Sequence, residues 1–235
     1  MSKPEVPSGI EHLALIERGS TLAERMSADV AREHECDHEL IGTALNALYQ
    51  AATCHRKCHG GPHILEALSG RLYNLGSSAF LLANRGFYDE SLNLVRSMGE
   101  ISNLISMSVI DKTAIKKWIA SDKKTRLKEF GPAHVRTLLQ QKAPELLIAD
   151  TDWYSQFCEL YTHVTPQTKP NVHNETGLAH AGGTFQPQGY ASALDELATV
   201  LASVAMIVCR YFKFDDLFEE IRCAIDAVSQ TRDAS

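Results

Sequence analysis

Apolar residues recur at helical spacing along most of the chain, and strand-like alternation is nearly absent. Glycine and proline separate the periodic stretches, notably at Gly60-Gly61-Pro62, which ends one helix and begins the next. The predicted helices run from Ser8 to Ala52 as one helix or two, from Pro62 to Asn84, and over 88–110, 112–121, 123–130, 132–142, 152–163, 190–212 and 214–230. This pattern predicts an all-α fold, a single helical bundle of long antiparallel helices that bury broad apolar faces.

Residues 164–189 differ from the rest because glycines and prolines interrupt them without a regular period. Loops of this length inside a compact domain are uncommon and are usually functional or mobile. We therefore expect one all-α domain over 10–230 that contains a long irregular loop. The ends, 1–9 and 231–235, are expected to be flexible.

Composition narrows the class of protein. The 235 residues are 44% apolar and 22% charged, with a net charge of −6, which argues against a dominant phosphate-backbone binder. Six cysteines follow a start that lacks an apolar leader, which favours a cytoplasmic protein without disulfides. The most apolar stretch, 197–212, is shorter than the roughly 20 residues of a membrane span, so we expect a core helix and no membrane partner.

The segment from His34 to His38 matches the HExxH zinc signature, with Glu35 as the candidate base. Two imidazoles four residues apart on a helix can bind one zinc ion and activate its water. The flanking residues are charged, however, and no third ligand is obvious. The favoured interpretation is a solvated helix face without metal, and a metal-dependent hydrolase built on His34, Glu35 and His38 is an alternative.

A second candidate metal segment is "CHRKCH", which spaces Cys54 from Cys58 and His55 from His59 by one helical turn. Zinc sites built on cysteine pairs usually take a second pair, and the other cysteines are scattered singly. Small apolar cysteines at a helix end are the favoured interpretation. No cofactor is therefore expected, and zinc or another divalent metal remains the alternative.

The predicted helix over 88–110 carries a narrow polar stripe formed by Asn93, Arg96, Glu100 and Asn103. Its apolar arc is wide, which indicates a helix central to the bundle, and consists of Leu94, Met98, Ile101, Leu104, Ile105 and Val109. The Arg96–Glu100 pair is favoured as a surface ion pair worth a few tenths of a kcal/mol. The alternative is a polar cleft between helices, in which neither charge could stay unpaired.

The irregular loop and the helix before it supply the densest cluster of candidate groups, namely Tyr161, His163, His173, Asn174 and His180. Histidines in such a loop can line a pocket or act as acid and base. His163 and His173 are the candidate catalytic residues.

The stretch "LLANRGFYDESLNLVRSMGEISNLI" and the later "LYTHVTP" resemble a family of uncharacterised bacterial all-helical proteins, over about 70–175. The matching residues are Gly86, Tyr88, Arg96, Glu100, Tyr161 and His163. That family is similar in helical layout to HEPN proteins, which include defence ribonucleases. Their Arg-to-His spacing occurs at Arg32–His38 and Arg56–His63, but not in the late helix where the motif belongs.

The resemblance implies a protein of defence or stress type. Together with the near-continuous apolar helix over 197–212, it also predicts a homodimer. We expect a binding module whose ligand site comprises Arg96, Glu100, Asn103, Tyr161 and His180. Its partner would be a small anion, RNA or a protein, with Arg96 holding the negative charge. The alternative is a metal-independent ribonuclease, in which His163 or His173 acts as acid and base and Arg96 stabilises the phosphate charge.

Overall fold

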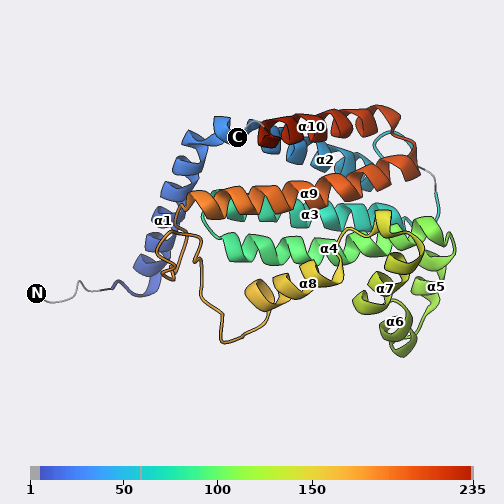
Figure 1. The fold of residues 1–235 in the computed structure, drawn as a ribbon, viewed down its shortest axis with the longest axis horizontal. Coiled ribbons are helices and arrows are strands. Elements are labelled where there is room, and N and C mark those ends of the chain that lie inside the picture. Colours follow the sequence, from blue (N-terminus) through green and yellow to red (C-terminus); the bar gives the residue numbers. More distant parts are fainter. Residues whose placement is uncertain (1–5, 59, 234–235) are drawn as a thin grey trace, which may run out of the picture.

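The computed structural model describes residues 6–58 and 60–233, and every regular element in these ranges is helical. The predicted all-α class is confirmed. Figure 1 shows the long helices lying side by side along the longest axis. They are α2 (Glu35–Ala52), α3 (Ile64–Asn84), α4 (Tyr88–Ile110), α9 (Pro187–Phe212) and α10 (Asp215–Asp233).

Helix α9 is the centre of the core, as its apolar composition predicts. It packs against α2, α3, α4 and α10. Its 18-residue apolar window has a mean hydropathy of 1.7, which suffices in composition for a membrane span, yet 61% of that window is buried inside the protein. The apolar sequence of α9 is therefore explained by burial within the bundle.

The connection between α3 and α4 is only three residues long and depends on Gly86. Gly86 has a φ of +78°, and a Cβ at this position would lie 2.5 Å from the backbone nitrogen of Thr184. Only glycine fits such a turn with a second backbone segment so close. Ser91 then joins the two helices by donating to the Ala79 carbonyl at 2.8 Å.

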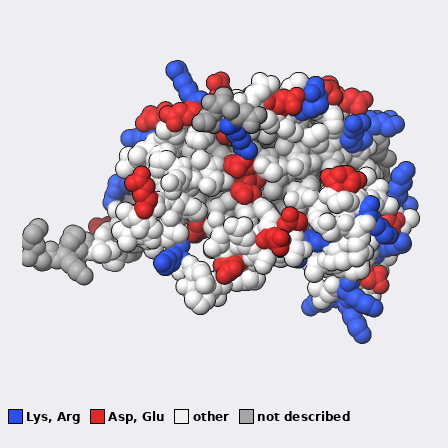
Figure 2. All heavy atoms as spheres, in the orientation of Figure 1, with Lys and Arg blue, Asp and Glu red and all other residues white. Residues whose placement is uncertain are grey.

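Short helices form a side lobe at one end of the bundle: α5 (Ala114–Ala120), α6 (Lys123–Glu129) and α7 (Pro132–Lys142). A small apolar cluster that includes Val135 and Leu139 holds the lobe to α4. Asp122 caps α6 by accepting from the Thr125 amide at 2.7 Å. Blue lysine and arginine atoms gather at this end in Figure 2, whereas red and blue alternate elsewhere on the visible face.

The helix predicted over 152–163 differs in its cap and its geometry. Asp150, and not Asp152, caps α8 (Thr151–Phe157) by accepting from the Trp153 amide at 2.8 Å. A π-helical turn, Cys158–Thr162, follows. The sequence offers two aspartates near this start, and only the first precedes the helix by the spacing that the cap requires.

The N-terminal region forms two helices separated by a 3₁₀ turn at Ala31–His34. Helix α1 (Gly9–Asp29) crosses one end of the bundle (Figure 1). Ser8 occupies its cap position, but its side chain makes no capping hydrogen bond. Most of the predicted flexible segment 1–9 lies outside the described residues, as do 234–235, whereas 231–233 belong to α10.

The irregular loop covers 163–186 and not 164–189, because Pro187 begins α9. Proline suits the first turn of a helix, where its missing N–H has no intrahelical partner.

Candidate functional site

The polar stripe on α4 is covered, turn by turn, by the segment from Ile148 to His173. This segment runs antiparallel to α4. Moving back along α4, the contacting pairs are Asn103 with Ala149, Glu100 with Tyr154, Arg96 with Tyr154 and Cys158, Asn93 with Thr162, and Asp89 with Asn171 and His173. The stripe is thus a partly buried network, and the favoured interpretation of Arg96–Glu100 as a simple surface pair is wrong.

Arg96 and Glu100 meet Tyr154 at the centre of this network. The Arg96 Nη2 and Glu100 Oε1 atoms are 2.9 Å apart, and their side chains are 15% and 30% exposed. The Tyr154 hydroxyl donates to Glu100 Oε1 at 2.6 Å and accepts from Arg96. Arg96 Nε also donates to Cys158 Sγ at 3.4 Å, which fixes the guanidinium against the start of the π turn.

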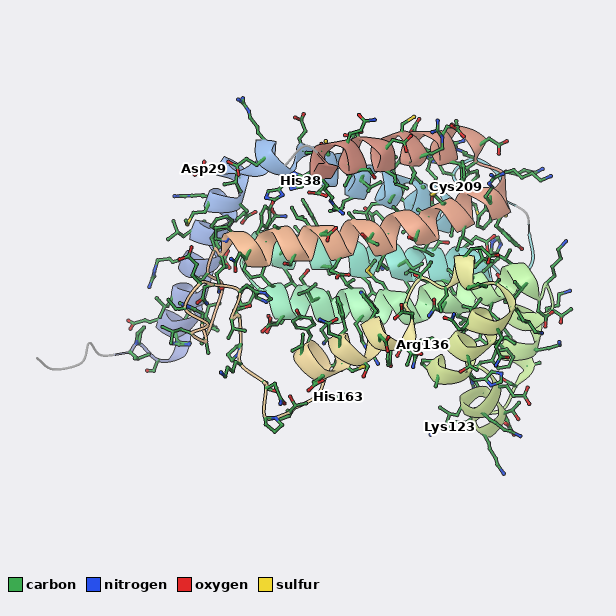
Figure 3. All side chains as sticks on the ribbon, in the orientation of Figure 1. Asp29, His38, Lys123, Arg136, His163 and Cys209 are labelled. Carbon is green, nitrogen blue, oxygen red and sulfur yellow. The ribbon has the colours of Figure 1, made fainter. Side chains whose placement is uncertain are left out.

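Arg136 brings a second guanidinium to the same tyrosine. Its Cζ lies 3.9 Å from the Tyr154 ring centroid, and that of Arg96 lies 4.4 Å away. Arg136 comes from α7 and is only 8% exposed, and its Nε has no hydrogen-bond partner among the described residues. In Figure 3 its label stands where α7 and α8 approach each other. A buried guanidinium without a carboxylate partner is costly unless an anion balances it.

The surroundings of Arg96 and Tyr154 keep both side chains in fixed protonation states. Burial lowers the pKa of Arg96, but the Cys158 contact and Glu100 outweigh burial, so its pKa is raised overall. Burial and the hydrogen bond to Glu100 raise the pKa of Tyr154 well above its ordinary value. Tyr154 therefore stays a neutral donor, and Arg96 stays charged, at every physiological pH.

The loop does not join this cluster through His173. His173 Nε2 lies 2.8 Å from Asp89 Oδ1, and Asp89 Oδ2 accepts from the Asn171 amide at 2.8 Å. Asp89 precedes Arg96 by seven residues, about 10 Å along the helix axis. Asn171 is itself buried and its side chain donates to the Gly86 carbonyl. Asp89 thus anchors the loop beside the start of α4.

The remaining predicted loop residues are dispersed. Tyr161 packs its ring on Phe157 and stacks on His173, with centroids 5.3 and 6.4 Å apart. Burial, followed by the charge of Asp89, raises the pKa of Tyr161 to about 12. His163 is exposed at the outer edge of the molecule, where the chain leaves the π-helical turn that follows α8 (Figure 3). His180 is half-buried, and its backbone amide binds the Pro170 carbonyl, so these groups share no common centre with Arg96.

The HExxH segment is not a continuous solvated helix. His34 ends the 3₁₀ turn and His38 lies in α2, and both rings pack on Tyr190. His38 Nε2 lies 2.9 Å from the Tyr190 hydroxyl, whereas His34 Nδ1 lies 3.5 Å from Asp37. Burial, and then the nearby His34, lower the pKa of His38. The two imidazoles therefore share Tyr190 as a packing partner, but their ring nitrogens face different polar groups, the Tyr190 hydroxyl and Asp37.

A small polar pocket of about 140 Å³ lies beside this segment. Its walls come from residues 32–37 and from the last turns of α10, including Val228 and Thr231. Acidic and basic side chains both line it, so the pocket has no dominant sign of charge.

Within the described ranges, one group of three metal-ligand side chains converges, and it lies elsewhere. Cys54, Cys58 and His63 place one ligand atom each within 4.8 Å of one another. They occupy the connection from α2 to α3, at the end of the bundle away from α1.

The arginine cluster consists of Arg96, Glu100, Arg136, Tyr154 and Cys158. The sequence predicts the first two of these residues as part of a site, but not Arg136, Tyr154 or Cys158. Tyr154 and Cys158 lie one helical turn apart, so a shared face was readable from their spacing. Gly99 was a second signal, since a glycine inside α4 indicates close approach. A Cβ there would lie 2.8 Å from the Ala149 Cβ. Arg136 had no signal, because nothing local links α7 to α8.

Comparison with known protein families, curated proteins and solved structures finds no match to this chain.

Proposed function

We propose that this chain is a binding module for a small anion, held by Arg136 and Arg96 beside Tyr154. The observation that carries the proposal is the buried, unpartnered Nε of Arg136. Guanidinium groups bind carboxylate and phosphate in paired hydrogen bonds, and Nε is one of the donors that such pairing uses. An anion of either kind would satisfy this donor.

The charge balance of the cluster supports the same conclusion. Arg96 is already neutralised by Glu100, which also accepts a hydrogen bond from the Tyr154 hydroxyl. Arg136 adds one positive charge that no described carboxylate pairs with. The local excess is therefore one positive charge in a chain whose net charge is −6. This excess favours a ligand with one or two negative charges over a cationic one.

Tyr154 gives the site its rigidity. Its ring lies against both guanidinium groups, and its hydroxyl bonds both Arg96 and Glu100. Groups already held in place lose little conformational entropy when a ligand arrives. The Arg96 and Glu100 side chains are 15% and 30% exposed, so the cluster is partly open to solvent.

Calorimetric titration tests the proposal with defined probes: inorganic phosphate, succinate and a single-stranded RNA. Wild type should bind phosphate or succinate, and Arg136→Met should lose that binding. Arg71→Met, an exposed arginine on α3, is the matched control and should bind like wild type. Binding of RNA alone, or equal phosphate binding by Arg136→Met, would reject a small-anion site at Arg136.

A metal-independent ribonuclease is the second candidate. The observation in its favour is the Asp89–His173 contact at 2.8 Å, since a carboxylate that orients an imidazole is a common arrangement for a general base. Labelled RNA incubated with wild type, His163→Ala and His173→Ala provides the test. Cleavage that is abolished in His173→Ala would favour the enzyme over the binding module.

A homodimer is part of the proposal, with α1 as its interface. Helix α1 faces the protein with the small residues Ser20, Ala23 and Ser27, which are almost fully buried. Its larger apolar side chains are exposed instead: Ile10, Leu13, Leu15, Ile16, Leu22 and Met26. Exposed apolar surface of this kind usually marks a contact site, and a second copy is the commonest partner. We retain the cytoplasmic location and the HEPN-like defence or stress role as further parts of the proposal.

A further inference from the structure

The connection between α2 and α3 brings two thiols and one imidazole together without any apolar core of its own. Helix α2 ends at Ala52 and α3 begins at Ile64, and none of the described residues from Thr53 to His63 is buried. Cys54 Sγ lies 3.7 Å from His63 Nδ1, and Cys58 Sγ lies 3.8 Å from His63 Nε2. These contacts are too long and too weak as hydrogen bonds to explain why the link adopts this shape.

The distances fit the ligands of one tetrahedral zinc ion. Zinc bonds of about 2.3 Å to sulfur and 2.0 Å to nitrogen put two ligand atoms roughly 3.6 Å apart. One ligand atom from each of Cys54, Cys58 and His63 falls within 4.8 Å of the others, so a closing movement of about 1 Å completes the geometry. The three-residue gap between the cysteines also lies within the range that zinc sites use.

Glu66 provides the partner that a metal-bound histidine usually has. Its Oε1 lies 3.4 Å from His63 Nδ1, one turn into α3. At 8% exposure, Glu66 is the least exposed acidic residue in the described part of the chain. A carboxylate on one imidazole nitrogen fixes the ring and leaves the other nitrogen for the metal. The arrangement therefore assigns Nε2 to the metal, on the side of Cys58.

The backbone at two of the three ligands is in a conformation that side chains rarely adopt. Cys54 has a φ of +51° and His63 a φ of +48°. Among the described residues, only two other non-glycine positions have a positive φ, Asn171 and Lys213. Such conformations persist where surrounding interactions determine them, and functional sites and ligand clamps are where they gather.

We propose that Cys54, Cys58 and His63 bind one zinc ion, with Glu66 orienting His63. Two thiolates and an imidazole favour zinc over magnesium or calcium, which prefer oxygen ligands. Both thiols release their protons to solvent when the metal binds. The fourth coordination position is open among the described residues. The ion joins the end of α2 to the start of α3, and this site is separate from the arginine cluster on α4 and α7.

Metal content and cobalt spectroscopy of the reduced full chain test this proposal. Wild type loaded with zinc should hold one ion per chain, and cobalt should give the thiolate charge-transfer band and the visible bands of a tetrahedral complex. Cys54→Ser, Cys58→Ser and His63→Gln should each lose the ion. The control Cys223→Ser, which changes an exposed cysteine on α10, should retain it. Glu66→Gln should weaken zinc affinity by about 10- to 100-fold while the cobalt bands remain.

Two results would overturn the site. One is a wild-type chain that binds no zinc under reducing conditions, or binds cobalt without a thiolate band. The other is zinc binding by Cys54→Ser and His63→Gln that equals binding by Cys223→Ser. The cobalt spectrum of wild type needs no variant, so the proposal stays testable even if a cysteine variant fails to fold.

Discussion

The side-chain amide of Asn103 both donates a hydrogen bond to Ala149 and accepts one from it. Its Nδ2 donates to the Ala149 carbonyl at 2.7 Å, and its Oδ1 accepts from the Ala149 amide at 3.2 Å. The same Oδ1 also accepts from the Ile148 amide at 3.1 Å. Asn103 therefore aligns the chain just before α8, and this alignment puts Tyr154 over Arg96 and Glu100.

Replacing Asn103 with alanine should destabilise the protein. The two buried backbone groups of Ala149 and the partly buried Ile148 amide would lose their partner, and each unsatisfied buried group costs about 1–3 kcal/mol. We expect a loss of at least ~1 kcal/mol in the free energy of unfolding, measured with urea. Asn46→Ala, an exposed asparagine on α2, should change stability by less than about 0.5 kcal/mol. Equal effects of the two variants would contradict the anchoring role of Asn103.

Asp89→Ala should release the 163–186 loop without unfolding the bundle. The substitution removes the partner of His173 and of the Asn171 amide together. Local opening of the loop then no longer has to break these two contacts, so its free energy cost falls. Hydrogen exchange of the loop amides should therefore become faster. The neighbouring Glu90→Ala, an exposed position, should leave loop exchange unchanged. Unchanged loop exchange in Asp89→Ala would show that other contacts hold the loop.

Helical periodicity was sufficient for the elements but not for how they meet. The ranges 88–110 and 132–142 were predicted as they occur, because Gly86 and Gly131-Pro132 mark their starts. The stripe residues on α4 were also identified. Which segment covers the stripe is a tertiary property, and the periodicity of α4 carries no information on it. The prediction therefore grouped Arg96 with His173, whereas His173 binds Asp89 two turns away.

The protonation of His38 should make stability depend on pH. Burial and His34 lower its pKa in the folded protein below the value of about 6.5 expected when unfolded. Above pH ~6.5 His38 is neutral in the folded and the unfolded protein, so its contribution to the free energy of unfolding is fully present. As pH falls below that value, the unfolded chain takes up the proton first and stability declines.

The decline in stability is measured as the difference in unfolding free energy between about pH 7.5 and pH 5.5, and comparison of variants separates the contribution of His38. His38→Gln should reduce the decline, because glutamine does not titrate. The exposed His134→Gln on α7 is the control and should decline like wild type. A decline in His38→Gln as large as in wild type would exclude His38 as a source of the pH dependence.

The exposed apolar residues of α1 should hold a dimer together. Leu22 is 59% exposed, and Met26 lies one turn further on the same face. Light scattering at micromolar concentration should give a dimer for wild type and a monomer for the double variant Leu22→Glu, Met26→Glu. Leu127→Glu, at a 69% exposed position on α6, should remain dimeric. A wild-type monomer at this concentration would contradict the proposed homodimer.

The most direct test of the anion site is the stability of Arg136→Met with and without phosphate. Without an anion, removing an unpaired buried charge in favour of an apolar side chain should be neutral or stabilising. Phosphate should stabilise wild type and the Arg71→Met control, by RTln(1 + [L]/Kd), and should leave Arg136→Met unchanged. If Arg136→Met instead loses several kcal/mol in both conditions, and phosphate stabilises none of the three proteins, then Arg136 is a structural residue and the anion site does not exist.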